Sequence, residues 1–177
     1  MLHTPTPYEF YLGGNYQFAS REGDAYNGAQ FHIAGFASLF GLEFQREQSS
    51  AKVMNALFHM RLFGYHNQTT NLTLHGGLRL RGQDSELRSV IAGLTTNLYF
   101  TRHFGLEGLY RYIFNSSAGE VGERIKAQRY EIGAFIDFKF LRLYGAYFHE
   151  QEIANQLRFQ SLFPLRKGGL MGFRFFF

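Results

Sequence analysis

The chain ends on Met171-Gly172-Phe173-Arg174-Phe175-Phe176-Phe177, a stretch in which large apolar side chains return at every second position. Successive side chains of a β-strand point to opposite faces, so one face of this stretch carries Met171, Phe173, Phe175 and Phe177. The opposite face carries Arg174, a charge that an apolar core does not accept without a partner. The C-terminus therefore predicts a strand with one apolar face and one face that carries a charge.

The same period of two recurs through the rest of the chain. It is clearest in residues 8–18, 72–81 and 129–138, where apolar residues alternate with polar residues or glycine. Each run is about ten residues long or slightly more, which is the length a tilted strand needs to cross a bilayer. On a helix the same apolar positions would spread around the whole cylinder. The pattern predicts an all-β protein.

Strands are predicted at 8–20, 28–39, 42–48, 53–64, 71–81, 87–100, 105–114, 127–138, 141–150 and 168–177. Tight connections alternate with longer polar ones at 21–28, 46–52, 81–86, 115–126 and about 151–167. Transmembrane barrels have this asymmetry, with short periplasmic turns and longer external loops. The sequence predicts a single-domain, closed antiparallel transmembrane β-barrel over 1–177. Ten strands are favoured. If 28–47 were one long strand, the parity of the later loops would need rearranging, and eight strands would become possible.

Composition favours a membrane barrel over a soluble one. Aromatic residues make up 18% of the chain, yet its mean hydropathy is only −0.22. An outer wall that faces lipid and a polar lumen reconcile these values, whereas a small soluble barrel would have to pack too many rings inside. The longest apolar stretch, 33–42, is too short for a spanning helix, which needs about twenty residues. The chain has no cysteine, and no metal or cofactor is expected.

The net charge of +4 does not predict a nucleic-acid partner, because the basic residues are scattered and form no stripe. A positive periphery suits the anionic headgroups of outer-membrane lipid and lipopolysaccharide. Residues 1–7 are expected to form a short periplasmic segment. They lack the charged and apolar regions of a signal peptide, so we expect the leader of an exported protein to have been removed.

The C-terminal stretch resembles the C-terminal signature of bacterial outer-membrane barrels, a terminal aromatic residue with hydrophobic residues two and four positions before it. In that family the barrel assembly machinery reads this signature, and the resemblance implies the same role for Phe173, Phe175 and Phe177. Gly169 stands where the family usually has a further aromatic residue. Residues 98–107 resemble the strand–turn–strand passages of small OmpA- and OmpW-like barrels. The resemblance implies an outer-membrane location.

The polar faces of the predicted strands would line the lumen. A narrow barrel tolerates buried charges only when they are paired or hydrogen-bonded, so Glu107 or Glu131 is expected to pair with Arg79, Arg81 or Arg111. The predicted lumen charge network comprises Glu43, His75, Arg79, Arg81, Glu107, Arg111, Arg129, Glu131 and Arg174. Such a lumen predicts a structural or interaction platform. The alternative is a narrow pore for small polar or anionic solutes.

A lipid-A-modifying enzyme is the third hypothesis. Neither a Gly-x-Ser-x-Gly elbow nor a His-Glu-x-x-His motif is present. The best catalytic candidates are His149 and Glu150, expected at the rim of the last external loop, but Gln151 stands where a serine nucleophile would be sought. The missing nucleophile favours a non-enzymatic function. The last external loop, about 151–167, is apolar for a loop and is a candidate contact site for a protein partner.

Overall fold

The fold is known from a computed structural model, which describes residues 7–21, 23–49, 52–82, 87–118, 121–152 and 166–177. Its strands are β1 (Tyr8–Arg21), β2 (Asp24–Ala37), β3 (Phe40–Gln48), β4 (Lys52–Phe63), β5 (Asn71–Gly82), β6 (Leu87–Tyr99), β7 (Phe104–Ala118), β8 (Val121–Phe138), β9 (Leu141–Glu152) and β10 (Arg166–Phe176). No helix in this part of the chain is long and apolar enough to cross a membrane.

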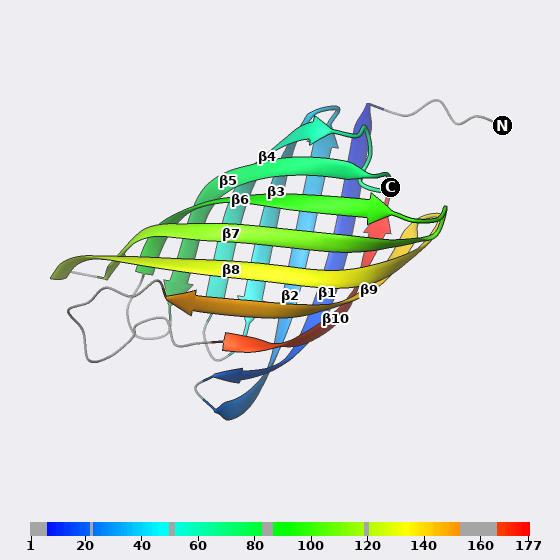
Figure 1. Ribbon diagram of the computed structural model, residues 1–177. Coiled ribbons are helices and arrows are strands. Elements are labelled where there is room, and N and C mark those ends of the chain that lie inside the picture. Colours follow the sequence, from blue (N-terminus) through cyan, green and yellow to red (C-terminus); the bar gives the residue numbers. More distant parts are fainter. Residues whose placement is uncertain (1–6, 22, 50–51, 83–86, 119–120, 153–165) are drawn as a thin grey trace.

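Each strand pairs antiparallel with its neighbours in sequence, and β1 pairs with β10 to close the barrel (Figure 1). The closing register runs from Tyr11↔Phe176 to Arg21↔Arg166, so the sheet has no free edge. The predicted all-β, closed, ten-stranded antiparallel barrel is confirmed. The eight-strand alternative is wrong, because the chain turns at Ser38, with a φ of 57°, and separates β2 from β3.

The first residue of β1 and the last residue of β10 lie at one end of the barrel, which we call the terminal end (Figure 1). The tight turns after β2, β4, β6 and β8 lie at the same end, and the opposite end, which we call the distal end, carries the other connections. Two predicted polar connections are wrong. The segment 21–28 is mostly strand, with a turn around Gly23 at a φ of 104°, and 115–126 lies largely in β7 and β8.

The β7–β8 hairpin explains why the sequence pattern does not show strand in the second of these segments. Ala127 pairs with Glu152, so residues 121–126 of β8 continue beyond the last described residue of β9. Figure 1 shows this hairpin reaching past the distal ends of its neighbours. A strand pair that extends past the barrel wall can be polar on both faces, so the period of two that marks a one-sided strand disappears from the sequence.

The barrel is polar inside and apolar outside. Among the described residues, 22 polar or charged side chains are buried, against 11 hydrophobic ones. Large hydrophobic side chains are instead exposed on the outer wall, among them Leu42 at 67% and Ile132 at 61%. A soluble barrel has the reverse arrangement, since its apolar faces pack inward. The predicted distribution of faces is therefore present in every strand whose burial pattern is described.

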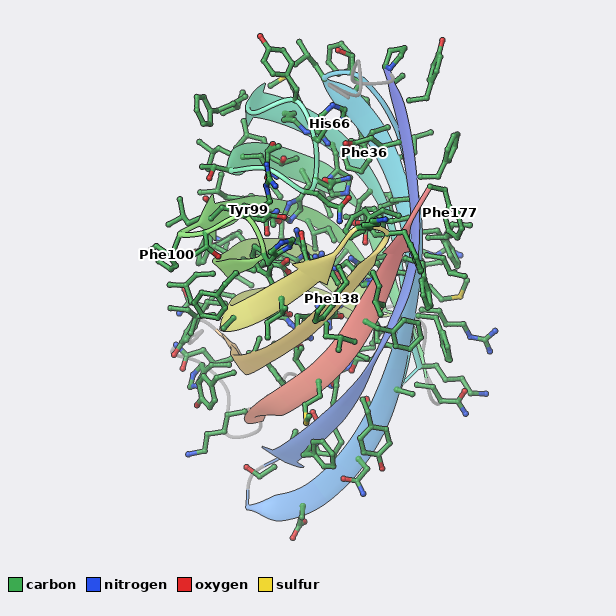
Figure 2. The ribbon with its side chains drawn as sticks, turned by 90° about the vertical axis from the view of Figure 1, so that its right-hand side faces the viewer. Phe36, His66, Tyr99, Phe100, Phe138 and Phe177 are labelled. Carbon is green, nitrogen blue, oxygen red and sulfur yellow. The ribbon has the colours of Figure 1, made fainter. Side chains whose placement is uncertain are left out.

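Exposed rings gather toward both ends of the outer wall. At the terminal end they include Tyr8, Phe40, Phe63, Tyr65, Phe100, Phe104, Phe138, Phe140 and Phe177. Figure 2 shows Phe100 and Phe177 pointing outward on different sides of the barrel, while Phe36 and His66 lie inside. Toward the distal end the exposed rings include Tyr16, Phe18, Phe31, Phe114, Tyr130 and Tyr147. Two aromatic girdles around an apolar band are typical of barrels that span a membrane.

Candidate functional site

The candidate site is the barrel interior, where inward side chains from all parts of the wall form three polar clusters. The terminal cluster contains Glu9, Arg61, Asn97, Glu107, Asp137, Arg142 and Arg174. The central cluster contains His32, Glu43, Gln45, His59, His75 and Arg111. The distal cluster contains Glu47, Arg79, Arg129, Glu131, Glu150 and Arg166. In each cluster, contacts join strands that are not neighbours in the sheet.

Arg142 organises the terminal cluster. Its side chain is fully buried, and the tight β8–β9 turn places it directly opposite Asp137, whose Oδ1 accepts a 2.7 Å hydrogen bond from Arg142 Nε. Nη1 donates to Asn97 at 3.2 Å and to Glu107 at 3.3 Å. The guanidinium also lies 3.9 Å from the ring centroid of Phe135. Five donors in a fixed fork let one arginine join several strands at once.

Glu107 is shared between two arginines of the terminal cluster. Arg174 donates from Nη1 to Oε2 at 2.5 Å and from Nη2 to Oε1 at 2.6 Å, a bidentate pair, while Arg142 reaches Oε2 from the side. The expected pairing of Glu107 with Arg79, Arg81 or Arg111 is therefore wrong. The curvature of the barrel brings Glu107 of β7 close to arginines of β9 and β10, and no local sequence pattern reveals this proximity.

The β4–β5 turn closes the terminal mouth of the barrel. Glu9 of β1 accepts hydrogen bonds from Arg61 Nη2 at 2.8 Å and from the backbone N–H of Asn67 at 3.2 Å, and it also contacts the His66 ring. The carbonyl oxygen of Asn67 accepts a 3.0 Å hydrogen bond from Arg142 of β9. The turn thus spans from β1 to the opposite wall, and Figure 2 places His66 inside the barrel.

The central cluster is built around Glu43 of β3. Its Oε2 lies 2.9 Å from His59 Nε2, and Oε1 accepts a 2.9 Å hydrogen bond from Gln45 Nε2. Across the lumen, Arg111 of β7 donates from Nη1 to Gln45 at 2.9 Å and from Nε to His75 at 3.2 Å. The acceptors of the Arg111 guanidinium are therefore the side chains of Gln45 and His75, and not the carboxylate of Glu107 or Glu131 that the sequence predicts.

A cavity of about 70 Å³ lies between the central and terminal clusters. Its lining includes Asn15, His32, Glu107, Arg111 and Arg174, so its wall is mostly polar. A polar cavity of this size has room for ordered water. Among the described atoms, Asn15 Oδ1 and His32 Nε2 are buried without a hydrogen-bond partner, which suits a hydrated pocket.

The distal cluster is centred on Glu150, which is 1% exposed. Glu150 accepts hydrogen bonds from Arg79 of β5 at 3.0 Å and from Arg129 of β8 at 3.2 Å. Arg129 also lies 3.5 Å from Glu47 of β3, on the opposite wall, and its Nε donates to Glu131 at 2.7 Å. The expected partner of Glu131 was Arg79, Arg81 or Arg111, but the structure pairs Glu131 with Arg129, two residues away on the same face of β8.

The proposed catalytic pair is separated by the strand itself. Glu150 points into the distal cluster, whereas His149 points outward and stacks on Tyr130 with ring centroids 4.9 Å apart. His149 Nε2 lies 3.1 Å from Gln151 Oε1. Neighbouring residues of a strand face opposite sides of the sheet, so His149 and Glu150 do not meet in one site, and a catalytic role for either residue stays a prediction. Among the described residues no group of His, Asp or Glu could hold a metal ion.

The rest of the predicted network lies inside the barrel, including Arg81, which is 7% exposed. At the C-terminus, Phe173 and Phe177 point outward, 40% and 77% exposed, and Phe175 stacks on Phe140 with centroids 6.2 Å apart. Their role in assembly stays a prediction. Most of the last external loop, residues 153–165, lies outside the described residues.

Sequence reasoning left Glu47, Arg142 and Arg166 out of the lumen network. All three are buried, and each makes an ion pair with a residue on another strand. The parity of β9 could have identified Arg142, since it shares a face with Glu150 and lies across a tight turn from Asp137. Arg166 precedes the first predicted residue of its strand, so no pattern marked it.

No family model and no curated protein matches this chain. Among solved structures, the translocator domain of autotransporter NalP from Neisseria meningitidis is similar over 98% of this chain and 90% of its own length. The sequence identity is 10% and the TM-score is 0.43. A similarity of this size defines no family, and the function has to be argued from the residues of this chain.

Proposed function

We propose that the protein is an integral barrel of the bacterial outer membrane that serves as a structural or interaction platform with a closed, charge-filled lumen. Support for the membrane comes from the apolar outer wall with aromatic rings toward both ends. Closure of β1 on β10 also satisfies the backbone, since lipid offers no hydrogen bonds to an open edge. The outer wall would contact lipid, and Phe173, Phe175 and Phe177 would be read by the assembly machinery.

The observation that carries the closed lumen is the set of contacts that cross it. Asn67 and Arg142 join opposite walls at the terminal end, and Arg111 reaches Gln45 at mid-height. Near the distal end, Glu47 and Arg129 again join opposite walls. Each of these contacts holds a buried arginine, and leaving a buried charge without its partner costs about 3–5 kcal/mol. The bridges would therefore stay in place at equilibrium and leave no path for solutes.

The pore and the enzyme receive less support. A path for polar or anionic solutes would need the crossing contacts to part, and the cavity between the clusters has a volume of only about 70 Å³. A lipid-modifying reaction would need a base and a nucleophile together, whereas His149 and Glu150 face opposite sides of β9. A platform requires neither an open lumen nor a base beside a nucleophile.

Planar-bilayer recording of the full chain, refolded in detergent, tests this proposal. Heat-modifiable migration in detergent gels would first establish that the barrel is folded. We expect folded protein to insert without discrete conductance steps. Reproducible steps would support the pore and overturn the closed lumen. Lipid A from cells that express the chain should keep its mass, and a new mass that disappears in His149→Ala would establish the enzyme instead.

A further inference from the structure

Charged side chains at the distal rim of the outer wall are mostly basic. At the distal ends of the strands, five outward side chains are basic and exposed, namely Arg46, Lys52, Arg88, Lys126 and Lys167. Among the strand carboxylates whose side chains the structure describes, all but Asp24, at the tip of the β1–β2 hairpin, point into the barrel and contact its arginines or histidines. The distal rim of the outer wall therefore presents positive charge toward its surroundings.

One part of this rim is also hollowed. A groove of about 470 Å³ lies on the outer wall over β1, β2 and β3, and its lining includes Tyr16, Ala29, Phe31, Arg46 and Gln48. The register explains the hollow. Ala29 pairs with Tyr16 on one side and with Gln48 on the other, so a methyl group stands between two long side chains. A groove floored by a small residue and bordered by rings suits a flexible apolar chain.

Two cations stand on the β3–β4 side of the groove. Arg46 pairs with Phe31 across β2 and β3, and Lys52 pairs with Gln48 across β3 and β4. Lys52 is the diagonal neighbour of Arg46, which sets the two residues about 7–8 Å apart. Among the described residues neither Arg46 nor Lys52 makes an ion pair. The two charges are thus available to one anionic group placed between them, and Gln48 offers an amide donor at the same point.

We propose that this groove binds a phosphorylated glycolipid of the outward-facing leaflet. Its phosphate would lie between Arg46 and Lys52, and an acyl chain would run along Tyr16 and Phe31 over Ala29. The combination of a cationic edge and an apolar groove fits a lipid, since either part alone would fit many ligands. This inference rests on the proposed membrane placement, and it adds a specific lipid site to it.

The test uses the full chain refolded in detergent and titrated with bisphosphorylated lipid A, with bound lipid counted by native mass spectrometry. A cation near an anionic surface contributes about fivefold in affinity. We therefore expect Arg46→Gln with Lys52→Gln to weaken binding about 25-fold. The charge-matched control, Arg102→Gln with Lys139→Gln in turns at the terminal end, should bind like the unchanged protein. Equal binding by both double variants would overturn the proposal.

Two further arms separate the parts of the site. Dephosphorylated lipid A should bind the unchanged protein about 25-fold more weakly, and equal affinity would overturn the role of the phosphate. Ala29→Phe fills the groove and keeps both charges, so it should also lower the affinity, and unchanged binding would overturn the acyl-chain groove. Phosphatidylglycerol that binds as tightly as lipid A would overturn the glycolipid assignment.

Heat-modifiable migration of every variant keeps the two proposals distinguishable. A folded barrel that shows no preference for phosphorylated lipid would contradict the lipid site and leave the membrane barrel intact. A chain that is folded and soluble without detergent would contradict both proposals.

Discussion

Asp137 and Arg142 face each other across the β8–β9 turn, with Arg142 Nε 2.7 Å from Asp137 Oδ1, and both side chains are buried in the barrel. The pair does more than hold two neighbouring strands. Arg142 continues to Glu107 of β7 and to the carbonyl oxygen of Asn67 in the β4–β5 turn. A cross-strand pair thus becomes a brace between opposite walls of the barrel.

Arg142→Ala should lower the free energy of unfolding by about 3–5 kcal/mol, because Asp137 would be left buried without its partner. Urea unfolding in detergent micelles measures the change. It can be followed by gel migration and by tyrosine fluorescence, since the chain has no tryptophan. The control is Arg102→Ala in the exposed β6–β7 turn, which should stay within about 0.5 kcal/mol of the unchanged protein.

The apolar replacement of the same pair gives a sharper expectation. Arg142→Met combined with Asp137→Leu removes both charges together, and such replacements are often close to neutral. We expect the double variant to be more stable than Arg142→Ala alone. A double variant as unstable as the single one would show that the other partners of Arg142, and not the pair, carry the effect.

Glu9→Ala should loosen the β4–β5 turn without unfolding the barrel. Glu9 accepts hydrogen bonds from Arg61 and from the backbone of Asn67, and these contacts hold the turn over the terminal mouth. Limited proteolysis within residues 64–70 should become faster, and heat-modifiable migration should remain. Glu131→Ala is the matched control, since the two side chains are similarly exposed, at 15% and 18%, and Glu131 contacts Arg129 instead. Equal cleavage of both variants would contradict the role of Glu9.

Gly77→Ala should be costly, because a Cβ built at Gly77 would lie 1.9 Å from the carbonyl oxygen of Ala56 on β4. Relief requires the β4 and β5 backbones to move apart, and such overpacking costs about 1–3 kcal/mol. Gly82→Ala provides the control on the same strand, since a Cβ there meets no atom within 4 Å. Urea midpoints that shift equally for the two variants would contradict close approach at Gly77.

The sequence by itself determined the strand pattern and which side of each strand is polar. A strand with one face toward an apolar medium must alternate apolar and polar residues. This alternation is visible within a single segment of sequence, without knowledge of the neighbouring strands. Arg174, Glu107 and Arg79 could each be assigned to the interior in this way. The pattern does not show a strand where both faces can be polar, as in residues 115–126 of the β7–β8 hairpin.

Only the tertiary structure decided which interior groups meet. Glu107 binds Arg174 and Arg142, and Arg79 binds Glu150, because curvature and stagger of the closed sheet set which heights coincide across the lumen. The strand pattern contains no information about that stagger. The same holds for the groove beside Arg46, which exists because the register sets Ala29 between Tyr16 and Gln48. Alternation fixed the faces, and closure of the barrel fixed the partners.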